Sequence, residues 1–218
     1  FQVHQWKGLF FVGGNKYFSS VTEELERRIG WLKLEKFTHD ESRHRDYEIK
    51  ANWALYIDNY LEGFHIPFVH GDLHEILDYD SYKTELFEGG VLQIGIANEG
   101  EECFDLPDSS PDYGENIAAY YYWIFPGLML NFYPWGLSVN IVNPISVDKT
   151  QIIYQGFVGN ENLLGKGAGG NLDKVELEDQ DIVEATQRGV SSTSYERGRY
   201  SPSKEMGVHY FHRLLTGL

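Results

Sequence analysis

Between residues 82 and 158 the chain consists of short apolar segments separated by tight turns, and this pattern limits the fold more than any other. Six strands are expected, over residues 82–87, 91–97, 118–125, 127–133, 137–142 and 151–158. Glycine and proline mark most of the turns, and the acidic stretch 98–115 is expected to be a loop. Connections this short join antiparallel neighbours, because parallel strands need a crossover of a dozen or more residues. The sequence therefore predicts an antiparallel meander.

Helical patterns flank this predicted sheet. Residues 53–64 carry apolar side chains at the i, i+3, i+4 and i+7 spacing of a helix with a broad buried face. Further helices are expected over about 21–31, 172–190 and 201–215, with a capping-box pattern from Ser20 to Glu23 at the first of them. We find neither an internal repeat nor a linker that would bound a second domain, so residues 1–218 are expected to form one domain. The predicted fold class is α+β, a twisted antiparallel sheet packed around helices on one face.

The charge balance argues against two classes of partner. The chain has 18 Lys and Arg against 33 Asp and Glu, a formal net charge of −15. A field of that sign repels phosphate backbones and anionic lipid head groups, so neither nucleic acid nor a membrane surface is expected as a partner. No apolar run approaches the ~20 residues of a membrane span, and no secretory signal is recognised, so we expect a cytoplasmic protein. The single cysteine, Cys103, excludes an internal disulfide and any site in this chain with several cysteine ligands.

Three of the eight histidines, His65, His70 and His74, lie close together just after the helix predicted at 53–64. A break near Pro67 would let His70 turn back toward His65, which a continuous helix does not allow at a spacing of five. Two converging imidazoles suit a borderline divalent metal. They do not complete a stable site by themselves, so a third ligand is needed.

Three residues compete for that third position. His74 would give an all-histidine site of the zinc-hydrolase kind. Glu62 lies one turn before His65, which suits an outer, hydrogen-bonding position better than direct binding. Asp179, on the helix predicted at 172–190, would close the site from another element. From spacing alone, polar histidines that bind no metal are an equally good interpretation.

Three segments carry more information than spacing. Residues 52–70, NWALYIDNYLEGFHIPFVH, resemble the pattern NW…(D/E)N…(D/E)xxHxxxxH in the catalytic domain of Rieske non-haem iron oxygenases. Residues 178–189 are similar to the acidic pair and the E-x-x-Q-x-G that follow in this family, and residues 195–212 are similar to its closing helix. The resemblance implies the helix-grip (START-like) fold. Within this chain, the DNYLE segment at residues 58–62 resembles choline, betaine and carnitine oxygenases more than ring dioxygenases.

Carried over to this chain, the resemblance assigns three ligands to a mononuclear Fe(II), namely His65, His70 and Asp179. Two histidines and one carboxylate on one face leave the opposite face open for dioxygen beside the substrate. Glu62 matches the acidic residue that links a metal histidine to the Rieske-cluster histidine of a neighbouring subunit. The family's polar residue near the iron corresponds to Asn59 or to Asp58, and a one-residue gap leaves the two open.

The implied reaction uses O2 and electrons from NAD(P)H to hydroxylate or oxidatively demethylate a small aromatic or quaternary ammonium substrate. A ferredoxin or flavin reductase is the implied electron donor, and a relay between subunits implies a homo-oligomer, a trimer by resemblance. The family's N-terminal Rieske domain binds a 2Fe–2S cluster through cysteines and histidines, and this chain has one cysteine. We therefore expect the Rieske domain to be absent from residues 1–218, either because the chain begins after it or because a separate ferredoxin replaces it. The chain alone is then expected to be inactive.

Two other interpretations stay open. One is a zinc hydrolase that uses His65, His70 and His74, and the other is a metal-free ligand-binding domain with the same START-like fold. Metal analysis distinguishes them, because only the zinc hydrolase requires a histidine in place of the carboxylate ligand.

Aromatic residues are dense at 120–123 and 132–135. We expect most of them to pack in the core and a few to line a pocket, where their rings suit an aromatic substrate or a quaternary ammonium group. Glu184 and Gln187 lie on the same predicted helix as Asp179, where they either support it or belong to a solvated face.

Overall fold

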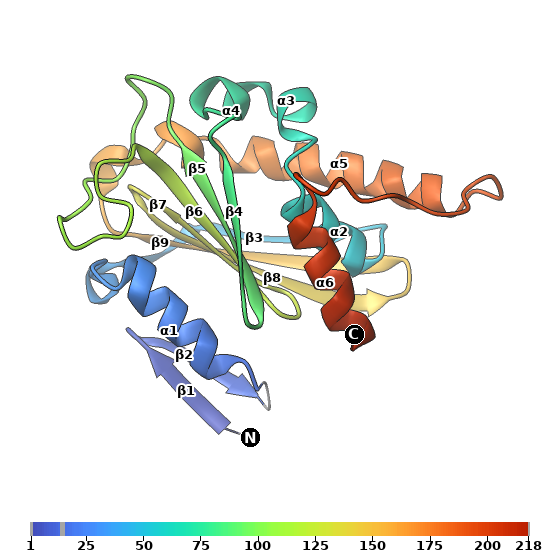
Figure 1. Cartoon of the computed structure of the whole chain (residues 1–218), viewed down its shortest axis with the longest axis horizontal. Coiled ribbons are helices and arrows are strands. Elements are labelled where there is room, and N and C mark those ends of the chain that lie inside the picture. The colour runs from blue at the N-terminus through green and yellow to red at the C-terminus, as the bar shows by residue number, and fades with distance from the viewer. Residues whose placement is uncertain (1, 14–15, 218) are drawn as a thin grey trace.

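The computed structural model describes residues 2–13 and 16–217, and a seven-stranded antiparallel sheet lies at its centre (Figure 1). The strands are β3 (Thr38–Ile49), β4 (Lys83–Phe87), β5 (Gly90–Ile96), β6 (Ile117–Ile124), β7 (Leu128–Tyr133), β8 (Gly136–Ser146) and β9 (Lys149–Val158). Strands β4 to β9 pair in chain order, and β3 pairs with β9 at the far edge. The predicted meander is confirmed.

Helices cover both faces of this sheet (Figure 1). On one face lie α2 (Trp53–Leu61), α5 (Leu172–Val190) and α6 (Met206–Thr216), and on the other lie α1 (Phe18–Ile29) and the hairpin of β1 (Gln2–Trp6) and β2 (Leu9–Gly13). Successive side chains of β6 point to opposite faces of the sheet. Tyr120 and Tyr122 pack in the cluster with α1, whereas Trp123 packs with α2 and α6. Our expectation of helices on a single face therefore missed the layer formed by α1 and the hairpin.

Short helical turns complete the described part of the chain. They are α3 (Ile66–Val69), α4 (Gly71–Ile76) and the 3-10 turns Leu34–Lys36, Glu161–Leu163 and Gly167–Gly169. None of the helices in residues 2–13 and 16–217 is long and apolar enough to cross a membrane.

Helix α2 leads into the histidine-rich segment, and both its ends have local causes. Asn52 caps it, since its side-chain oxygen accepts the backbone N–H of Ala54 at 3.0 Å. The helix ends at Leu61, and Glu62 is extended with φ −105° and ψ 146°. The helix predicted through residue 64 is therefore too long. Glu62 lies beyond the end of the helix, so it does not share a helix face with Asn59 or His65. Pro67 does not begin irregular chain but lies in the first turn of α3, where proline is tolerated.

Two further helix starts differ from the prediction. Helix α1 begins at Phe18, before the expected capping box, and among the described residues no side chain caps it. The Thr22 hydroxyl donates to the Phe18 carbonyl inside the helix instead, at 2.9 Å. The last helix begins at Met206 rather than at 201. Local sequence patterns thus locate these helices but misplace their first turns.

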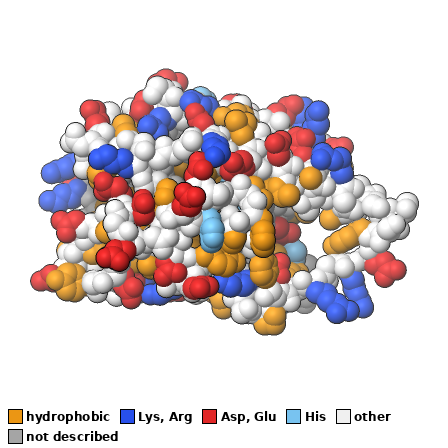
Figure 2. Space-filling view, turned by 90° about the horizontal axis from the view of Figure 1, so that it is seen from above, with side chains coloured by type: hydrophobic (Ala, Val, Ile, Leu, Met, Phe, Trp, Pro, Cys, Tyr) orange, Lys and Arg blue, Asp and Glu red, His pale blue; other side chains and the backbone are white. Residues whose placement is uncertain are grey.

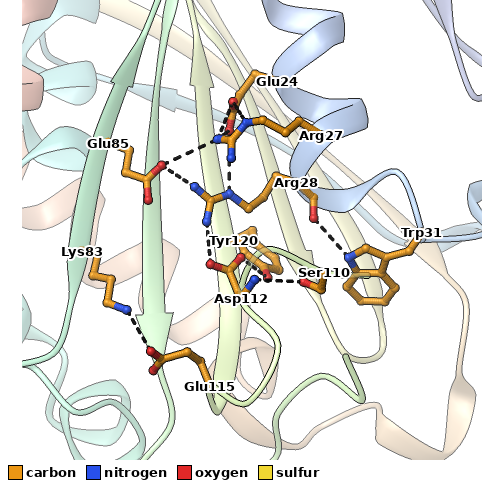
Figure 3. Close-up of polar contacts among 10 residues, drawn as sticks. All are labelled: Glu24, Arg27, Arg28, Trp31, Lys83, Glu85, Ser110, Asp112, Glu115 and Tyr120. Carbon is orange, nitrogen blue, oxygen red and sulfur yellow. Dashed lines mark hydrogen bonds and ion pairs between the residues drawn. The ribbon is translucent and has the colours of Figure 1, made fainter. Parts of the chain in front are cut away.

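One buried arginine holds the long acidic loop between β5 and β6 (Figure 3). Arg28 of α1, whose side chain is 5% exposed, pairs with Asp112 of the loop at 2.5 Å between Nη1 and Oδ1. It also forms an ion pair with Glu85 of β4. The Tyr120 hydroxyl of β6 donates to the other Asp112 oxygen at 2.8 Å. The cluster therefore ties α1, the loop and the sheet together.

Candidate metal centre

Two imidazoles and one carboxylate converge from three separate parts of the chain. His65 follows α2, His70 lies between α3 and α4, and Asp179 lies on α5. One ligand atom from each lies within 4.8 Å of the others, and they are the one such group among the described residues. Asp179 Oδ1 is 3.4 Å from His65 Nε2 and 3.0 Å from His70 Nε2. The structure thus brings together the three residues that the resemblance assigns to a metal.

The outer nitrogen of each imidazole contacts a second carboxylate. His65 Nδ1 lies 2.6 Å from Glu62 Oε1, and His70 Nδ1 lies 2.9 Å from Glu178 Oε2. When Nδ1–H donates to these carboxylates, each Nε2 is left to bind a metal and each ring is held in place. Our sequence analysis placed Glu178 in an acidic pair without a role, because nothing in its spacing indicates contact with His70, 108 residues away.

Asn59 and Asp58, which the sequence left open, have different surroundings. The Asn59 side-chain amide donates to Asp179 Oδ1 at 2.7 Å. Asp58 Oδ1 instead lies 2.9 Å from Nε2 of His212 on α6, away from the three converging residues. Asn59 therefore contacts the candidate centre and Asp58 does not.

Three other residues considered from the sequence lie elsewhere. His74 is on α4, with its ring 6.2 Å from that of Tyr79, and does not join the group found among residues 2–13 and 16–217. On α5, Glu184 accepts the backbone N–H of Lys50 and Gln187 that of Asn52, both at 2.8 Å. Glu184 and Gln187 therefore anchor α5 to the start of α2 and do not contact Asp179.

The charges at the centre favour a cation between these groups. Burial lowers the pKa of His65, but hydrogen bonds to Asp179 and Glu62 outweigh it and raise that pKa to about 9. Burial likewise lowers the pKa of His70, and Asp179 and Glu178 raise it overall. Burial raises the pKa of Asp179, yet its hydrogen bonds with the two histidines bring it down to about 2. Two imidazoles and a carboxylate in this setting suit a divalent metal, which the surrounding carboxylates would help to balance.

A cavity of about 80 Å³ adjoins the three converging residues. Five tyrosines share its lining: Tyr56, Tyr60, Tyr82, Tyr121 and Tyr133. Polar groups come from Asn59, Gln93 and Asn131, and the Tyr60 hydroxyl donates to Asn131 Oδ1 at 2.6 Å. The candidate centre therefore opens onto a chamber lined by both aromatic rings and polar side chains.

One more carboxyl group lines this cavity. Glu176 lies on α5 one turn before Asp179, and its Oε2 accepts hydrogen bonds from the hydroxyls of Tyr154 and Tyr56, the latter at 3.2 Å. Burial and the negative charge of Asp179 raise its pKa from the ordinary 4.5 to about 8, although the two hydroxyls oppose the shift. Our sequence analysis passed over Glu176, because nothing in an acidic helix marks which of its carboxylates will line a cavity.

This shift predicts a pH-dependent effect of Glu176→Gln on stability. The folded protein keeps a proton on Glu176 that the unfolded chain loses above pH 4.5, so this stability is complete below pH 4.5 and is lost as the pH rises to about 8. Glutamine does not titrate. In thermal unfolding of chelator-treated protein, the variant should therefore gain on the wild type between pH 5 and pH 8, by at most about 1.4 kcal/mol per pH unit. Asp173→Asn, on the exposed side of the same helix, should show no such gain, and parallel curves for Glu176→Gln and wild type would refute the expectation.

Comparisons with known proteins now bear on this geometry. Residues 34–216 match the family model described as "Ring hydroxylating alpha subunit (catalytic domain)". The chain is 34% identical over 179 residues to a chloroplastic choline monooxygenase of Arabidopsis thaliana, covering 78% of this chain and 40% of that protein. It is 26% identical over 231 residues to the carnitine monooxygenase oxygenase subunit of Escherichia coli K12, covering 99% of this chain and 60% of that protein. The chain thus spans about half the length of these relatives.

Solved structures show the same fold. A quaternary ammonium Rieske monooxygenase superposes with a TM-score of 0.74 at 22% identity, over 99% of this chain and 60% of that one. Naphthalene 1,2-dioxygenase from Rhodococcus sp. superposes with a TM-score of 0.67 at 15% identity, over 99% of this chain and 65% of that one. The helix-grip architecture predicted from the resemblance is therefore confirmed.

Proposed function

The chain belongs to the family of ring-hydroxylating alpha subunit catalytic domains, and from this premise we propose that it holds one Fe(II) through His65, His70 and Asp179. The observation that carries the proposal is the convergence of these ligand atoms within 4.8 Å beside a cavity. When bound, ferrous iron supplies the activation of dioxygen at coordination positions that the protein leaves open. The product is a hydroxylated or oxidatively demethylated small organic molecule.

The residues around the centre hold its geometry. Glu62 and Glu178 accept from the Nδ1–H groups and thereby direct each Nε2 toward the metal. The Asn59 amide donates to Asp179 and orients the carboxylate. The tyrosine rings in the cavity wall would limit the water around a bound substrate, and electrostatic contacts there would be correspondingly stronger. The centre is therefore prepared before the substrate arrives.

We propose that Glu62 also lies on the route by which electrons reach the iron. Its other oxygen accepts the Phe64 amide, and its side chain is still 17% exposed. Nearby Phe68 is 88% exposed, an apolar group available to an adjoining protein surface. A 2Fe–2S cluster needs several cysteines, so it would reside outside this chain, on a neighbouring subunit of a trimer that a ferredoxin or flavin reductase supplies. A solved relative is described as revealing inter-subunit electron transfer. Without such a partner, this chain would not turn over.

For the substrate we propose a quaternary ammonium compound. Two of its relatives are named as monooxygenases of choline and of carnitine. In this chain the cavity presents tyrosine rings, whose faces attract such cations. Figure 2 shows acidic side chains spread over the face seen from above, interspersed with basic ones, and the net charge of −15 favours the approach of cations.

Anaerobic titration of the chain with Fe(II) tests this proposal. We expect one iron per chain, and nitric oxide, a spectroscopic probe of open positions on Fe(II), should give an electron paramagnetic resonance signal that choline perturbs. His74→Ala should bind iron like the wild type, since His74 lies outside the group. A chain that takes up no stoichiometric iron, or one whose metal depends on His74 and not on Asp179, would contradict the proposal and favour the zinc-hydrolase alternative.

A further inference from the structure

Glu176 and Asp179 lie three residues apart on α5, and both line the same cavity. Side chains at this spacing share a helix face, and three residues advance about 4.5 Å along a helix. A group bound at Glu176 is therefore held about one helical turn from the residue assigned to the metal.

The carboxyl group of Glu176 has only half of its hydrogen-bonding capacity satisfied. Both tyrosine donors, Tyr56 and Tyr154, reach Oε2. Among residues 2–13 and 16–217, no group donates a hydrogen bond to Oε1, and no Lys, Arg or His forms an ion pair with this carboxylate. Burial and Asp179 raise the pKa of this unpaired group to about 8, so without a bound cation it keeps its proton, and a cation beside Oε1 would favour its charged form. A positively charged group from a ligand could therefore contact Glu176 Oε1, because no described side chain of the protein occupies that position.

The charged groups around Glu176 do not fill that place. Asp179 is negative, and His70, which faces Glu176 across the cavity, is committed to Asp179 and Glu178. A second cavity also borders Glu176 and contains two arginines of β3. Each is paired with another carboxylate: Arg43 with Asp40 of β3 at 3.3 Å, and Arg45 with Asp173 of α5 at 2.7 Å.

Three tyrosines that line the same cavity, Tyr82, Tyr121 and Tyr133, pack together in its wall. Tyr121 packs edge-on against Tyr133 with ring centroids 5.9 Å apart, and Tyr82 is stacked on Tyr121 at 6.5 Å. Burial raises the pKa of each of these hydroxyls, so they stay protonated and offer ring faces rather than charges. Neutral aromatic faces with one carboxylate are the chemistry that recognises an alkylammonium group.

We propose that Glu176 determines specificity in this cavity by pairing with a trialkylammonium head group that rests against the tyrosine rings. The inference rests on the proposed function, since it concerns the substrate of the same centre. It assigns to Glu176 a task that the metal residues do not perform. They determine where oxygenation takes place, and Glu176 determines which molecules are held there. A neutral molecule of the same shape would occupy the cavity without this partner.

Calorimetry on the anaerobic, iron-loaded chain tests the inference with two ligands of equal shape. Choline carries the charge, and 3,3-dimethylbutan-1-ol replaces its nitrogen by carbon. The wild type should bind choline more tightly than its neutral isostere. Glu176→Gln, which keeps an acceptor for both tyrosines, should weaken choline about 10- to 100-fold and leave the isostere unchanged. Glu176→Asp retains the charge and should keep part of the preference. Asp181→Asn removes an exposed charge from the same helix, outside both cavities, and should keep all of it.

Three results would overturn the inference, and a fourth would support it while contradicting the proposed function. Equal affinity of the wild type for the two ligands overturns the inference, and so does a Glu176→Gln variant that weakens both ligands alike, because that indicates packing rather than charge. Failure of choline to bind while iron is stoichiometric overturns it too and leaves the iron assignment intact. Selective choline binding through Glu176 in a chain that takes up no iron supports the inference and contradicts the proposed function.

Discussion

Replacing Asp179 by alanine should lower the iron content of the reconstituted chain from one atom to close to zero. Asp179 is the carboxylate that both imidazoles face, at 3.4 and 3.0 Å, and it is the group that arrives from a distant helix. Its removal leaves two imidazoles, a set that holds ferrous iron weakly. Loss of groups that only orient a metal ligand typically weakens binding 10- to 100-fold, so loss of a ligand should exceed about 100-fold. Anaerobic equilibrium dialysis against Fe(II) measures the affinity.

Asp181→Ala is the matched control for this experiment. Asp181 lies on the same helix, is exposed, and belongs to neither the converging group nor the cavity. Its loss removes the same formal charge from α5, so it reports the general electrostatic effect of the helix on cation binding. We expect iron affinity within about twofold of wild type, since exposed charges interact weakly. Unchanged iron affinity in Asp179→Ala would refute the ligand assignment.

Replacing Arg28 by methionine should lower the free energy of unfolding by about 3–5 kcal/mol. The side chain of Arg28 is 5% exposed and that of its partner Asp112 is 10% exposed, so the change leaves a carboxylate enclosed without its counter-ion (Figure 3). Methionine retains most of the volume, and the effect is therefore electrostatic rather than a cavity effect. Urea unfolding followed by tryptophan fluorescence measures it, as a lower midpoint with an unchanged slope.

The neighbouring residue provides the control. Arg27 lies on the same helix turn, but its side chain is 51% exposed and it pairs with Glu24 at 2.7 Å and Glu85 at 3.8 Å. Exposed pairs contribute about 0–1 kcal/mol, so Arg27→Met should change stability by no more than that. Similar midpoints for the two variants would show that Arg28 does not hold the acidic loop in the way described.

The parts of the fold that could be predicted are those with local causes. Strands β4 to β9 follow one another through tight turns, apart from the acidic loop between β5 and β6, so apolar alternation and the position of glycine and proline were enough to order them. The end of α2 was not predictable in this way, because the apolar rhythm continues from Leu61 to Phe64 while the chain leaves the helix. The layer of α1 on the second face was missed for a similar reason. A helix pattern gives its apolar side but not the face of the sheet that receives it.

In the candidate site, too, only residues close together in the sequence could be predicted to meet. His65 and His70 could be singled out because they share one short segment, whereas the third ligand stayed open among Glu62, His74 and Asp179 until the resemblance was considered. Contacts between segments remote in sequence stayed hidden altogether. Glu178 reaches His70 across 108 residues, and Arg28 reaches Asp112 across 84. No spacing rule connects such positions, since only the folded sheet brings their helices and loops together.

The separation between His70 and Asp179 also has a thermodynamic consequence. The two residues are 109 positions apart, and the segment between them contains strands β4 to β9. A metal held by both would act as a removable cross-link that closes this long loop and restricts the unfolded ensemble, as a disulfide does. The chain has a single cysteine and no means of forming such a covalent link within itself. Loading the metal would then set how firmly α5 stays docked on the rest of the molecule, so cofactor supply would also control the lifetime of the folded state.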